Sequence, residues 1–267
     1  MSCVVVDRPA PGITRITMNR PDRLNVLDAA LVDDLSGALE DVDDDLSCRV
    51  VVLTGAGRAF SAGLDLNGYG DDARLGQQGR LLGMLARQRE IAFVTEQLHR
   101  LRQPVIAAVN GPAAGGGLAF VCACDIRIAA DTAEFAVSFI RAGYSACDIG
   151  VSWLLPRIIG AGAAHELMLT GRRFGSAEAF RVGLVADVVS PTALTDTVLA
   201  KAAEIMLNPP ASVELTKQGM WIALESPSLL HAIEFENRQQ MVTAMTEDAA
   251  EATQAFLGKR SPSYRRR

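Results

Sequence analysis

The sequence lacks the cysteine pattern of a disulfide-stabilised secreted protein or of a structural zinc site. Its five cysteines, an odd number, are Cys3, Cys48, Cys122, Cys124 and Cys147. They form no paired framework, and no second Cys or His pair accompanies Cys122 and Cys124. We therefore expect reduced thiols in a cytoplasmic protein, and no metal site.

Long apolar runs and a basic field are also missing. No stretch of about eighteen uncharged apolar residues occurs, so we expect no membrane-spanning helix. Residues 1–9 carry two charges by residue eight and no long apolar run, so we expect no signal peptide. The net charge of −5 and the pI near 5.3 give no reason to expect a nucleic-acid partner.

What the sequence does contain is enough apolar material for a large core, 49% of 267 residues. Val50–Leu53, Val105–Val109 and Ile126–Ala130 are short apolar runs typical of buried strands, and a glycine turn or a new segment follows each. Val4–Val6 and Ile13–Met18 predict a hairpin-like opening. The pattern predicts an α/β fold in which helices flank buried strands.

Helical spacing of apolar residues covers Asp28–Asp43 and Arg87–Leu101. After Val189 the strands stop, and three further helices are predicted at Leu194–Leu207, Ser212–Leu224 and Leu229–Leu257. We therefore expect a core formed by residues 1–194 and a helical C-terminal region formed by residues 195–267.

Two glycine-rich turns follow buried strands, within Leu53–Leu66 and Val109–Ala119. Glycine allows close backbone approach, and a glycine run entering a helix presents free N–H groups. Two such donors converging on one oxygen would form an oxyanion hole. Ordinary tight turns are the alternative. A dinucleotide turn at Gly55-x-Gly57, as in an NAD-dependent reductase, is disfavoured because Phe60 occupies the place of the third glycine.

Several segments together resemble the successive signatures of the enoyl-CoA hydratase/isomerase (crotonase) family. They are Asn19–Leu27, Ala59–Leu66, Asn110–Gly117, Cys124–Arg127, Leu155–Arg157, Leu169–Arg172 and Thr246–Arg260. The resemblance extends over nearly the whole chain.

This resemblance implies a crotonase-like spiral of ββα units with a helical C-terminal region that completes the CoA site and packs subunits into homotrimers or hexamers. It implies an acyl-CoA thioester substrate, whose coenzyme A is part of the substrate, and no separate cofactor. The backbone N–H groups of Leu64 and Gly116 would stabilise the thioester enolate. Asp65 is expected to cap the helix that follows it.

The resemblance also implies CoA contacts from Arg23, Arg58, Ala62, Phe256 and Lys259. The two arginines would face the CoA phosphates, or would be solvated surface residues. Phe256 and Lys259 would reach CoA from the chain's C-terminal end, in the same or a neighbouring subunit. Simple helix packing is the alternative for Phe256.

The pattern departs from family hydratases at the two positions where they carry catalytic glutamates. Ala119 and Phe139 stand there, and neither side chain transfers protons. Asp148 remains, in a stretch resembling the dienoyl-CoA isomerase branch, where an aspartate moves a proton. Its apolar neighbours predict desolvation and a raised pKa. Capping of a helix over residues 150–159 is the alternative role for Asp148.

We therefore expect an acyl-CoA-processing enzyme that uses Asp148 as a single base for isomerisation, in preference to hydration by two glutamates. The alternative is a non-catalytic acyl-CoA-binding protein. Residues 71–83 are rich in glycine, glutamine and charge and look mobile. The stretch from 71 to 88 is expected to line the acyl pocket.

Overall fold

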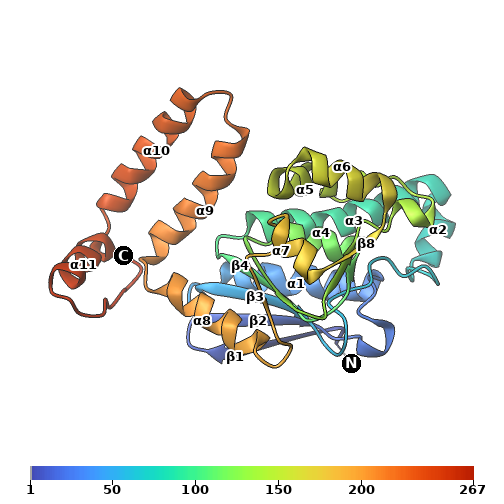
Figure 1. Ribbon diagram of the computed structural model, residues 1–267, viewed down its shortest axis with the longest axis horizontal. Coiled ribbons are helices and arrows are strands. Elements are labelled where there is room, and N and C mark those ends of the chain that lie inside the picture. Colours follow the sequence, from blue (N-terminus) through green and yellow to red (C-terminus); the bar gives the residue numbers. More distant parts are fainter. Residues whose placement is uncertain (1) are drawn as a thin grey trace.

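The computed structural model describes residues 2–267, and its strands form two sheets (Figure 1). The larger sheet has the order β1-β2-β3-β4-β6-β9, and the smaller has the order β5-β7-β8. The strands are β1 (Val4–Ala10), β2 (Ile13–Met18), β3 (Val50–Gly55), β4 (Val105–Val109), β5 (Ala113–Ala114), β6 (Ile126–Ala130), β7 (Glu134–Ala136), β8 (Arg173–Gly175) and β9 (Asp187–Val189).

The larger sheet begins as an antiparallel hairpin and continues as a parallel sheet. β1 pairs antiparallel with β2, which confirms the predicted opening hairpin. From β2 to β9 every neighbouring pair is parallel. β3 and β4 run in the same direction, so their C-terminal ends lie at the same edge of the sheet. The glycine turns that follow the two strands therefore lie at that edge. An isolated parallel bridge between Ser61 and Ala113 joins these two turns directly.

Helices flank this sheet and then continue alone to the C-terminus. They are α1 (Ala29–Asp44), α2 (Asp72–Gln78), α3 (Arg80–Arg100), α4 (Gly116–Ala123), α5 (Val151–Ile159), α6 (Ala161–Thr170), α7 (Ser176–Arg181), α8 (Leu194–Met206), α9 (Pro210–Glu225), α10 (Leu229–Ala244) and α11 (Glu247–Leu257), with 3-10 turns η1 (Pro21–Arg23) and η2 (Ile140–Ala142). Across residues 2–267, no helix combines the length and the apolar character needed to cross a membrane.

Alternation along the central strands divides the core into two clusters. Val51 and Leu53 of β3 face the larger cluster, which contains residues of α1, α3 and α4. Val50 and Val52 face the smaller cluster, where α8 covers the sheet. β3 is therefore buried on both faces, as its uninterrupted apolar sequence predicts.

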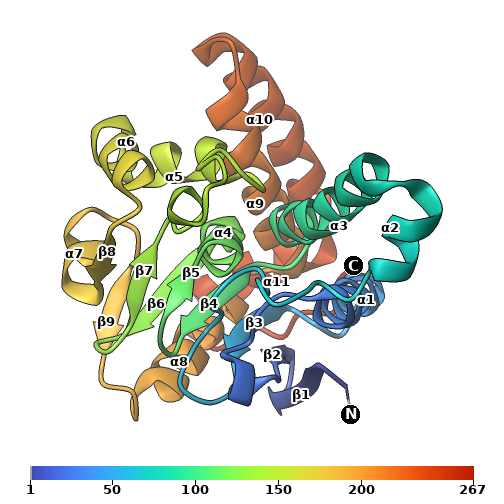
Figure 2. The same cartoon turned by 90° about the vertical axis from the view of Figure 1, so that its right-hand side faces the viewer.

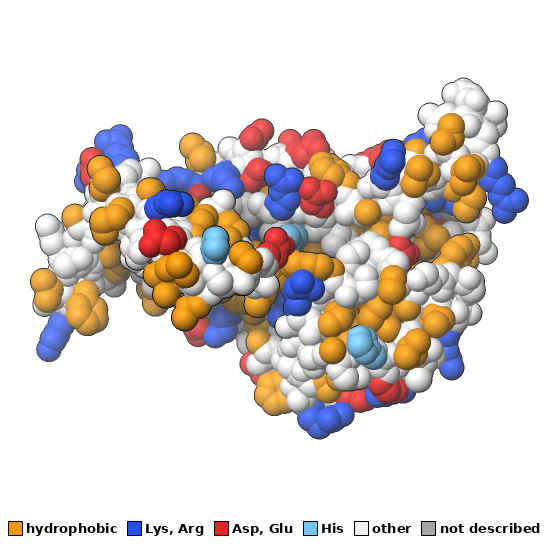
Figure 3. Space-filling model, turned by 90° about the horizontal axis from the view of Figure 1, so that it is seen from above, with side chains coloured by type: hydrophobic (Ala, Val, Ile, Leu, Met, Phe, Trp, Pro, Cys, Tyr) orange, Lys and Arg blue, Asp and Glu red, His pale blue; other side chains and the backbone are white. Residues whose placement is uncertain are grey.

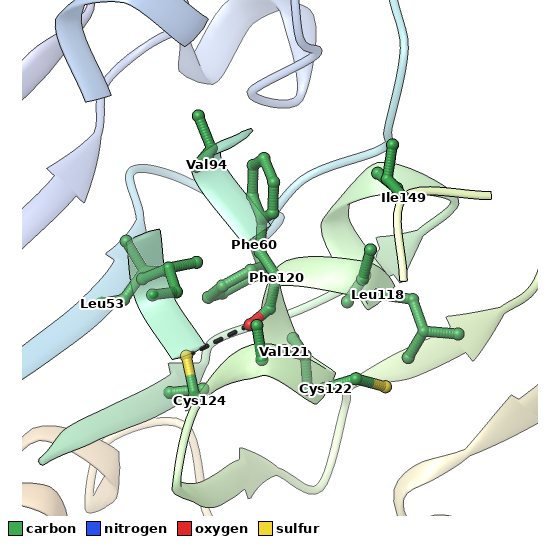
Figure 4. Close-up of a cluster of buried hydrophobic side chains, with 14 of the residues drawn as sticks. Leu53, Phe60, Val94, Leu118, Phe120, Val121, Cys122, Cys124 and Ile149 are labelled. Atoms are coloured by element: carbon green, nitrogen blue, oxygen red, sulfur yellow. Dashed lines mark hydrogen bonds between the residues drawn. The ribbon is translucent and has the colours of Figure 1, made fainter. Parts of the chain in front are cut away.

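Helix α4 lies at the centre of the larger cluster (Figure 4). All its residues are buried, and Phe120 carries no exposed surface. The Cys124 thiol is buried beside it and donates to the Phe120 carbonyl over 3.2 Å. Burial raises the pKa of the Cys122 thiol to about 12. These thiols act as small core side chains, as expected for reduced cysteines.

The predicted start of α3 at Arg87 is wrong, because the helix begins at Arg80. Residues 71–83, which the sequence predicts to be a mobile segment, contain α2 and the first turn of α3. Gly79, at φ +77°, separates the two helices. The ion pairs Asp71–Arg87 and Arg74–Glu90 hold α2 against α3. Because charged contacts leave no apolar periodicity in the sequence, the pattern did not predict α2 or the first turns of α3.

The single helix predicted for 229–257 is also wrong, because the chain breaks between α10 and α11. Thr246 Oγ1 accepts a hydrogen bond from Ala249 N over 3.1 Å and caps α11. The hydroxyl competes with the backbone for this N–H and starts a new helix.

The C-terminal helices leave the sheet after α8. Figure 1 shows α9, α10 and α11 extending away from the core, with α11 at the opposite end of the molecule from α2. Helix α8 itself contributes Leu194, Val198 and Ala202 to the smaller core cluster. The functional division into residues 1–194 and 195–267 stays a prediction.

Candidate functional site

Figure 2 shows α3, α4 and α5 on the same side of the larger sheet. A pocket is lined by residues of α3, the start of α4, the loop before α5 and the first glycine turn, and its volume, open mouth included, is about 820 Å³. Its lining is Leu27, Ala62, Leu64, Leu66, Met84, Arg87, Gln88, Ile91, Gly115, Gly116, Ser138, Phe139, Ala142, Tyr144, Asp148 and Ile149. Of the stretch from 71 to 88, the contributing residues are Met84, Arg87 and Gln88.

Leu64 reaches the pocket with its backbone N–H unused. Leu27 N donates to Gly63 O over 2.8 Å, and Asp65 N donates to Leu27 O over 3.0 Å. In this parallel bridge the N–H of Leu64, between the two, points away from Leu27, and residues 2–267 provide it with no backbone acceptor. It is available to a ligand oxygen.

Gly116 provides the second free donor, because it is the first residue of α4. The opening N–H groups of a helix have no carbonyl within the helix to bond, and they carry its positive dipole end. Gly63 is packed closely here, since a Cβ placed on it would lie 3.3 Å from Gly116 N. The donors of Leu64 and Gly116 therefore border one region of the pocket.

The first turn tolerates no larger residue at Gly63. Its φ is +88°, and an added Cβ would lie 2.7 Å from the carbonyl oxygen of Ala114. Gly117 is equally constrained on the other turn, where a Cβ would lie 2.3 Å from Ser61 O. The close approach of the two backbones explains why these sequence segments need glycine.

Asn25 holds the first glycine turn in place through hydrogen bonds, a role that the sequence did not reveal. It is fully buried, and its Nδ2 donates to the carbonyls of Ala59, over 2.9 Å, and Phe60, over 3.2 Å. Ser61 Oγ donates back to Asn25 O over 2.7 Å. Asn25 has φ +52°, a conformation that asparagine adopts more readily than most residues. The only sequence signal was its place in the Asn19–Leu27 signature.

Asp148 is half-buried in the pocket wall. Its Oδ1 accepts hydrogen bonds from Gln88 Nε2 and, over 2.8 Å, from Ile149 N. Burial raises the pKa of the Asp148 carboxyl, and the two hydrogen bonds oppose that shift. The raised pKa agrees with the expectation of desolvation.

The alternative role of Asp148, as a cap of α5, is not observed. The N-cap of α5 is Gly150, and no side chain forms a capping hydrogen bond there. The backbone at Ile149 has φ +32°, which is rare for a β-branched residue. Such strain is costly and often accompanies functional sites.

The two positions where the family resemblance leads us to expect glutamates differ in their surroundings. Ala119 is fully buried in α4 and is not part of the pocket lining, while Phe139 lies in the pocket wall. Among the lining residues, Asp148 is the only carboxylic acid.

The candidate CoA-binding residues lie in two separate places. Ala62 lines the pocket, and Arg58 is exposed on the turn that leads to it. Arg23, at the end of η1, places Nη2 2.5 Å from Asp65 Oδ2, in an ion pair that lacks hydrogen-bond geometry. Phe256 and Lys259 lie in and just after α11, around a different hollow that Tyr264 also lines.

The expected cap by Asp65 is wrong, because no helix starts beside it. Asp65 is buried, pairs with Arg23, and accepts from Asn67 N over 3.0 Å in a turn. An aspartate side chain forms such a turn as readily as a cap.

A second polar cluster, whose residues are not part of the pocket lining, was also missed. Lys217 of α9 pairs with Asp125, and Trp221 donates to the same carboxylate. The His99 ring packs edge-on against Trp221 and Trp153, with ring centroids 4.2 and 5.7 Å away, and burial lowers the pKa of its imidazole. Within residues 2–267, no group of three or more His, Cys, Asp or Glu side chains is arranged to hold a metal ion.

Known proteins resemble this chain over its full length. It is 41% identical over 265 residues to the Mycobacterium tuberculosis protein named "Probable enoyl-CoA hydratase EchA12". The aligned region covers 99% of this chain and 93% of that one. It is 36% identical to the 1,2-epoxyphenylacetyl-CoA isomerase of Escherichia coli, over 95% of both chains.

The fold is equally well matched. The crystal structure of an enoyl-CoA hydratase from Bacillus anthracis superposes with a TM-score of 0.92 at 34% identity, over 99% of this chain and 100% of that one. The expected α/β crotonase fold, with spiral sheets and C-terminal helices, is thereby confirmed. The sequence profile of the enoyl-CoA hydratase/isomerase family matches residues 9–267. The chain is therefore an acyl-CoA enzyme that belongs to the enoyl-CoA hydratase/isomerase family.

Proposed function

We propose that this enzyme isomerises an unsaturated acyl-CoA with Asp148 as its single base, and that the N–H groups of Leu64 and Gly116 stabilise the enolate. The observation that carries the proposal is the shared pocket. The one carboxylate in the lining faces the same cavity as the two backbone donors. Its raised pKa suits a group that must both take and return a proton.

In this reaction Asp148 removes a proton from the α-carbon of a 3-enoyl thioester. The electron pair of the C–H bond moves into an enolate, whose oxygen the N–H groups of Leu64 and Gly116 hold. The protonated Asp148 then gives the proton to the γ-carbon, and the double bond moves by one position. One carboxyl group is enough for both transfers.

Hydration has less support in this pocket. It needs a group that activates water and a group that protonates the α-carbon. Ala119 and Phe139 stand where family hydratases carry those glutamates, which favours isomerisation. Relatives carry both kinds of name, since one is called a hydratase and the Escherichia coli protein an isomerase.

For the CoA part of the substrate, we propose contacts from Arg23, Arg58 and Ala62 of the same chain. Arg58 is exposed beside the first turn, where a phosphate would meet it. Phe256 and Lys259 lie at the other end of the molecule and would serve the pocket of a neighbouring subunit (Figure 1).

This assignment requires an oligomer, and the surface of the C-terminal region supports one. Figure 3 shows many apolar side chains over the end of the molecule where these helices lie. The exposed ones include Leu229, Met241, Met245, Phe256 and Leu257. We propose that residues 195–267 bury them in a homotrimer or hexamer. Light scattering of the purified protein would test this, and a monomer at micromolar concentration would contradict it.

A non-catalytic acyl-CoA-binding protein is the second candidate, favoured by Ala119 and Phe139. One experiment separates the possibilities. The protein is incubated with a 2-enoyl-CoA and a 3-enoyl-CoA in heavy water, and the products are followed by NMR. A shifted double bond, or deuterium at the α- or γ-carbon, supports isomerisation. Added water would support hydration instead, and binding without any exchange would support the binder.

A further inference from the structure

Gln88 and Asp148 meet across the pocket from two distant parts of the chain. Gln88 belongs to α3, and Asp148 lies 60 residues later in the loop before α5. The amide Nε2 donates to Asp148 Oδ1. Both residues line the pocket. Gln88 is thus the one side chain among residues 2–267 that forms a hydrogen bond with this carboxylate.

Both hydrogen bonds of the carboxylate fall on the same oxygen. Ile149 N also donates to Oδ1, over 2.8 Å. Asp148 Oδ2 has no hydrogen-bond partner in the part of the chain described, and it is not among the fully buried polar atoms there. The two oxygens of Asp148 therefore differ, because Oδ1 is held by two donors while Oδ2 is accessible and has none.

Within residues 2–267, no charged group shifts the pKa of Asp148. The other titratable side chains that line the pocket are Arg87 from α3 and Tyr144 from the loop after η2. Arg87 is paired with the buried Asp71 and stacks over the Tyr69 ring, 4.9 Å from its centroid. Only burial and the hydrogen bonds from Gln88 and Ile149 act on the pKa of Asp148.

We propose that Gln88 is a positioning residue that holds Asp148 Oδ1 and leaves Oδ2 as the oxygen that carries the proton. The inference rests on the proposed role of Asp148 as the base and adds how that base is oriented. A neutral amide suits this task, because a lysine or arginine at position 88 would form an ion pair and weaken the base. A hydrogen bond to the carboxylate stabilises it less and keeps it basic.

The test uses full-length Gln88→Leu and Gln88→Glu, with Gln78→Leu as the matched control. Gln78 is an exposed glutamine of α2 outside the pocket lining, so it reports the effect of losing an amide nearby. The first readout is the ¹³C NMR titration of the Asp148 carboxyl, assigned with Asp148→Asn. The second is kcat and KM against pH, with trans-3-hexenoyl-CoA as the substrate.

In Gln88→Leu the Asp148 titration should move to higher pH, and the acid limb of the kcat profile should follow it. On that limb kcat should fall by about tenfold, the loss expected for one partly exposed hydrogen bond to a carboxylate. KM should change by no more than about twofold, because Gln88 acts on the base and not on CoA. Gln88→Glu should raise the Asp148 titration further, since two carboxylates would share the site. Gln78→Leu should match the wild type.

An unchanged Asp148 titration in Gln88→Leu would overturn the inference, whatever the activity. Inactivity of Asp148→Asn together with a wild-type pH profile in Gln88→Leu would overturn it too, while leaving the proposed function intact. Retained turnover in Asp148→Asn would overturn the proposed function and the role of Gln88 together.

Discussion

The Lys217 ammonium lies 2.8 Å from Asp125 Oδ2, and both side chains are buried. Lys217 Nζ also donates to the carbonyls of Leu98, over 3.3 Å, and Gln103, over 3.0 Å, so its three protons all have acceptors. Trp221 Nε1 donates a hydrogen bond to Asp125 Oδ1 over 3.3 Å. One buried charge pair therefore joins α9 to the end of α3 and the start of β6.

Replacing Lys217 with methionine should lower the free energy of unfolding by about 3–5 kcal/mol, because it leaves the buried Asp125 carboxylate without its cation. Chemical denaturation at fixed protein concentration would measure the loss. Lys201→Met is the control, since Lys201 pairs with Glu204 on the exposed surface of α8. Equal stabilities of the two variants would show that the buried pair does not anchor α9.

Replacing Gly63 with alanine should lower kcat by about 10²–10³-fold, the usual effect of losing an oxyanion donor. The new Cβ would meet the Ala114 carbonyl at 2.7 Å and force the Leu64 N–H out of position. Steady-state isomerisation kinetics with a 3-enoyl-CoA would measure the fall in kcat. Gly37→Ala in α1 is the control, because nothing lies within 4 Å of a Cβ there. If both variants kept full activity, the donor assignment to Leu64 would be wrong.

Replacing Asn25 with alanine should cost about 2–3 kcal/mol of unfolding free energy, because buried carbonyls of the first turn lose their donor. Activity should fall with stability, since the same turn carries Leu64. Thermal and chemical denaturation would measure the first effect and steady-state kinetics the second. Asn67→Ala, on the exposed side of the turn, should change neither. A stable but inactive Asn25→Ala would mean that Asn25 orients the turn without supporting the fold.

Much of the fold was predictable because its signals are local. Val50–Leu53 and Val105–Val109 are apolar runs that only a doubly covered strand accommodates, and both lie in the parallel sheet. The glycine turns were found because glycine alone allows the observed approach of Gly63 to Ala114 and of Gly117 to Ser61.

The missed features depend on contacts between distant residues. The contact of Gln88 with Asp148 spans 60 residues, and the Lys217 contacts with Leu98 and Gln103 span more than a hundred. A glutamine or lysine on a helix normally indicates a solvated face, and nothing local marks the exceptions. The start of α3 was missed for a related reason, since ion pairs and not an apolar stripe hold its first turns.

The raised pKa of Asp148 predicts how stability depends on pH. The folded state favours the neutral acid, while the unfolded chain ionises at the ordinary value near 3.8. The advantage of the neutral form is complete below that value and is lost as pH rises through the folded-state pKa. Asp148→Asn carries a neutral side chain at every pH, so its stability relative to the wild type should increase as pH rises from the ordinary value through the folded-state pKa, and stay constant above it.

The gain should be small, on the order of 0.5 kcal/mol, because the half-buried carboxylate is partly solvated. Denaturant unfolding of both proteins across this pH range would measure it. Asp72→Asn, at an exposed position of α2, is the control for exchanging a carboxylate for an amide. A stability difference for Asp148→Asn that stayed constant with pH would mean that folding does not disfavour the carboxylate. In that case Asp148 would have an ordinary carboxyl group, and the main argument for its basicity in the pocket would be lost.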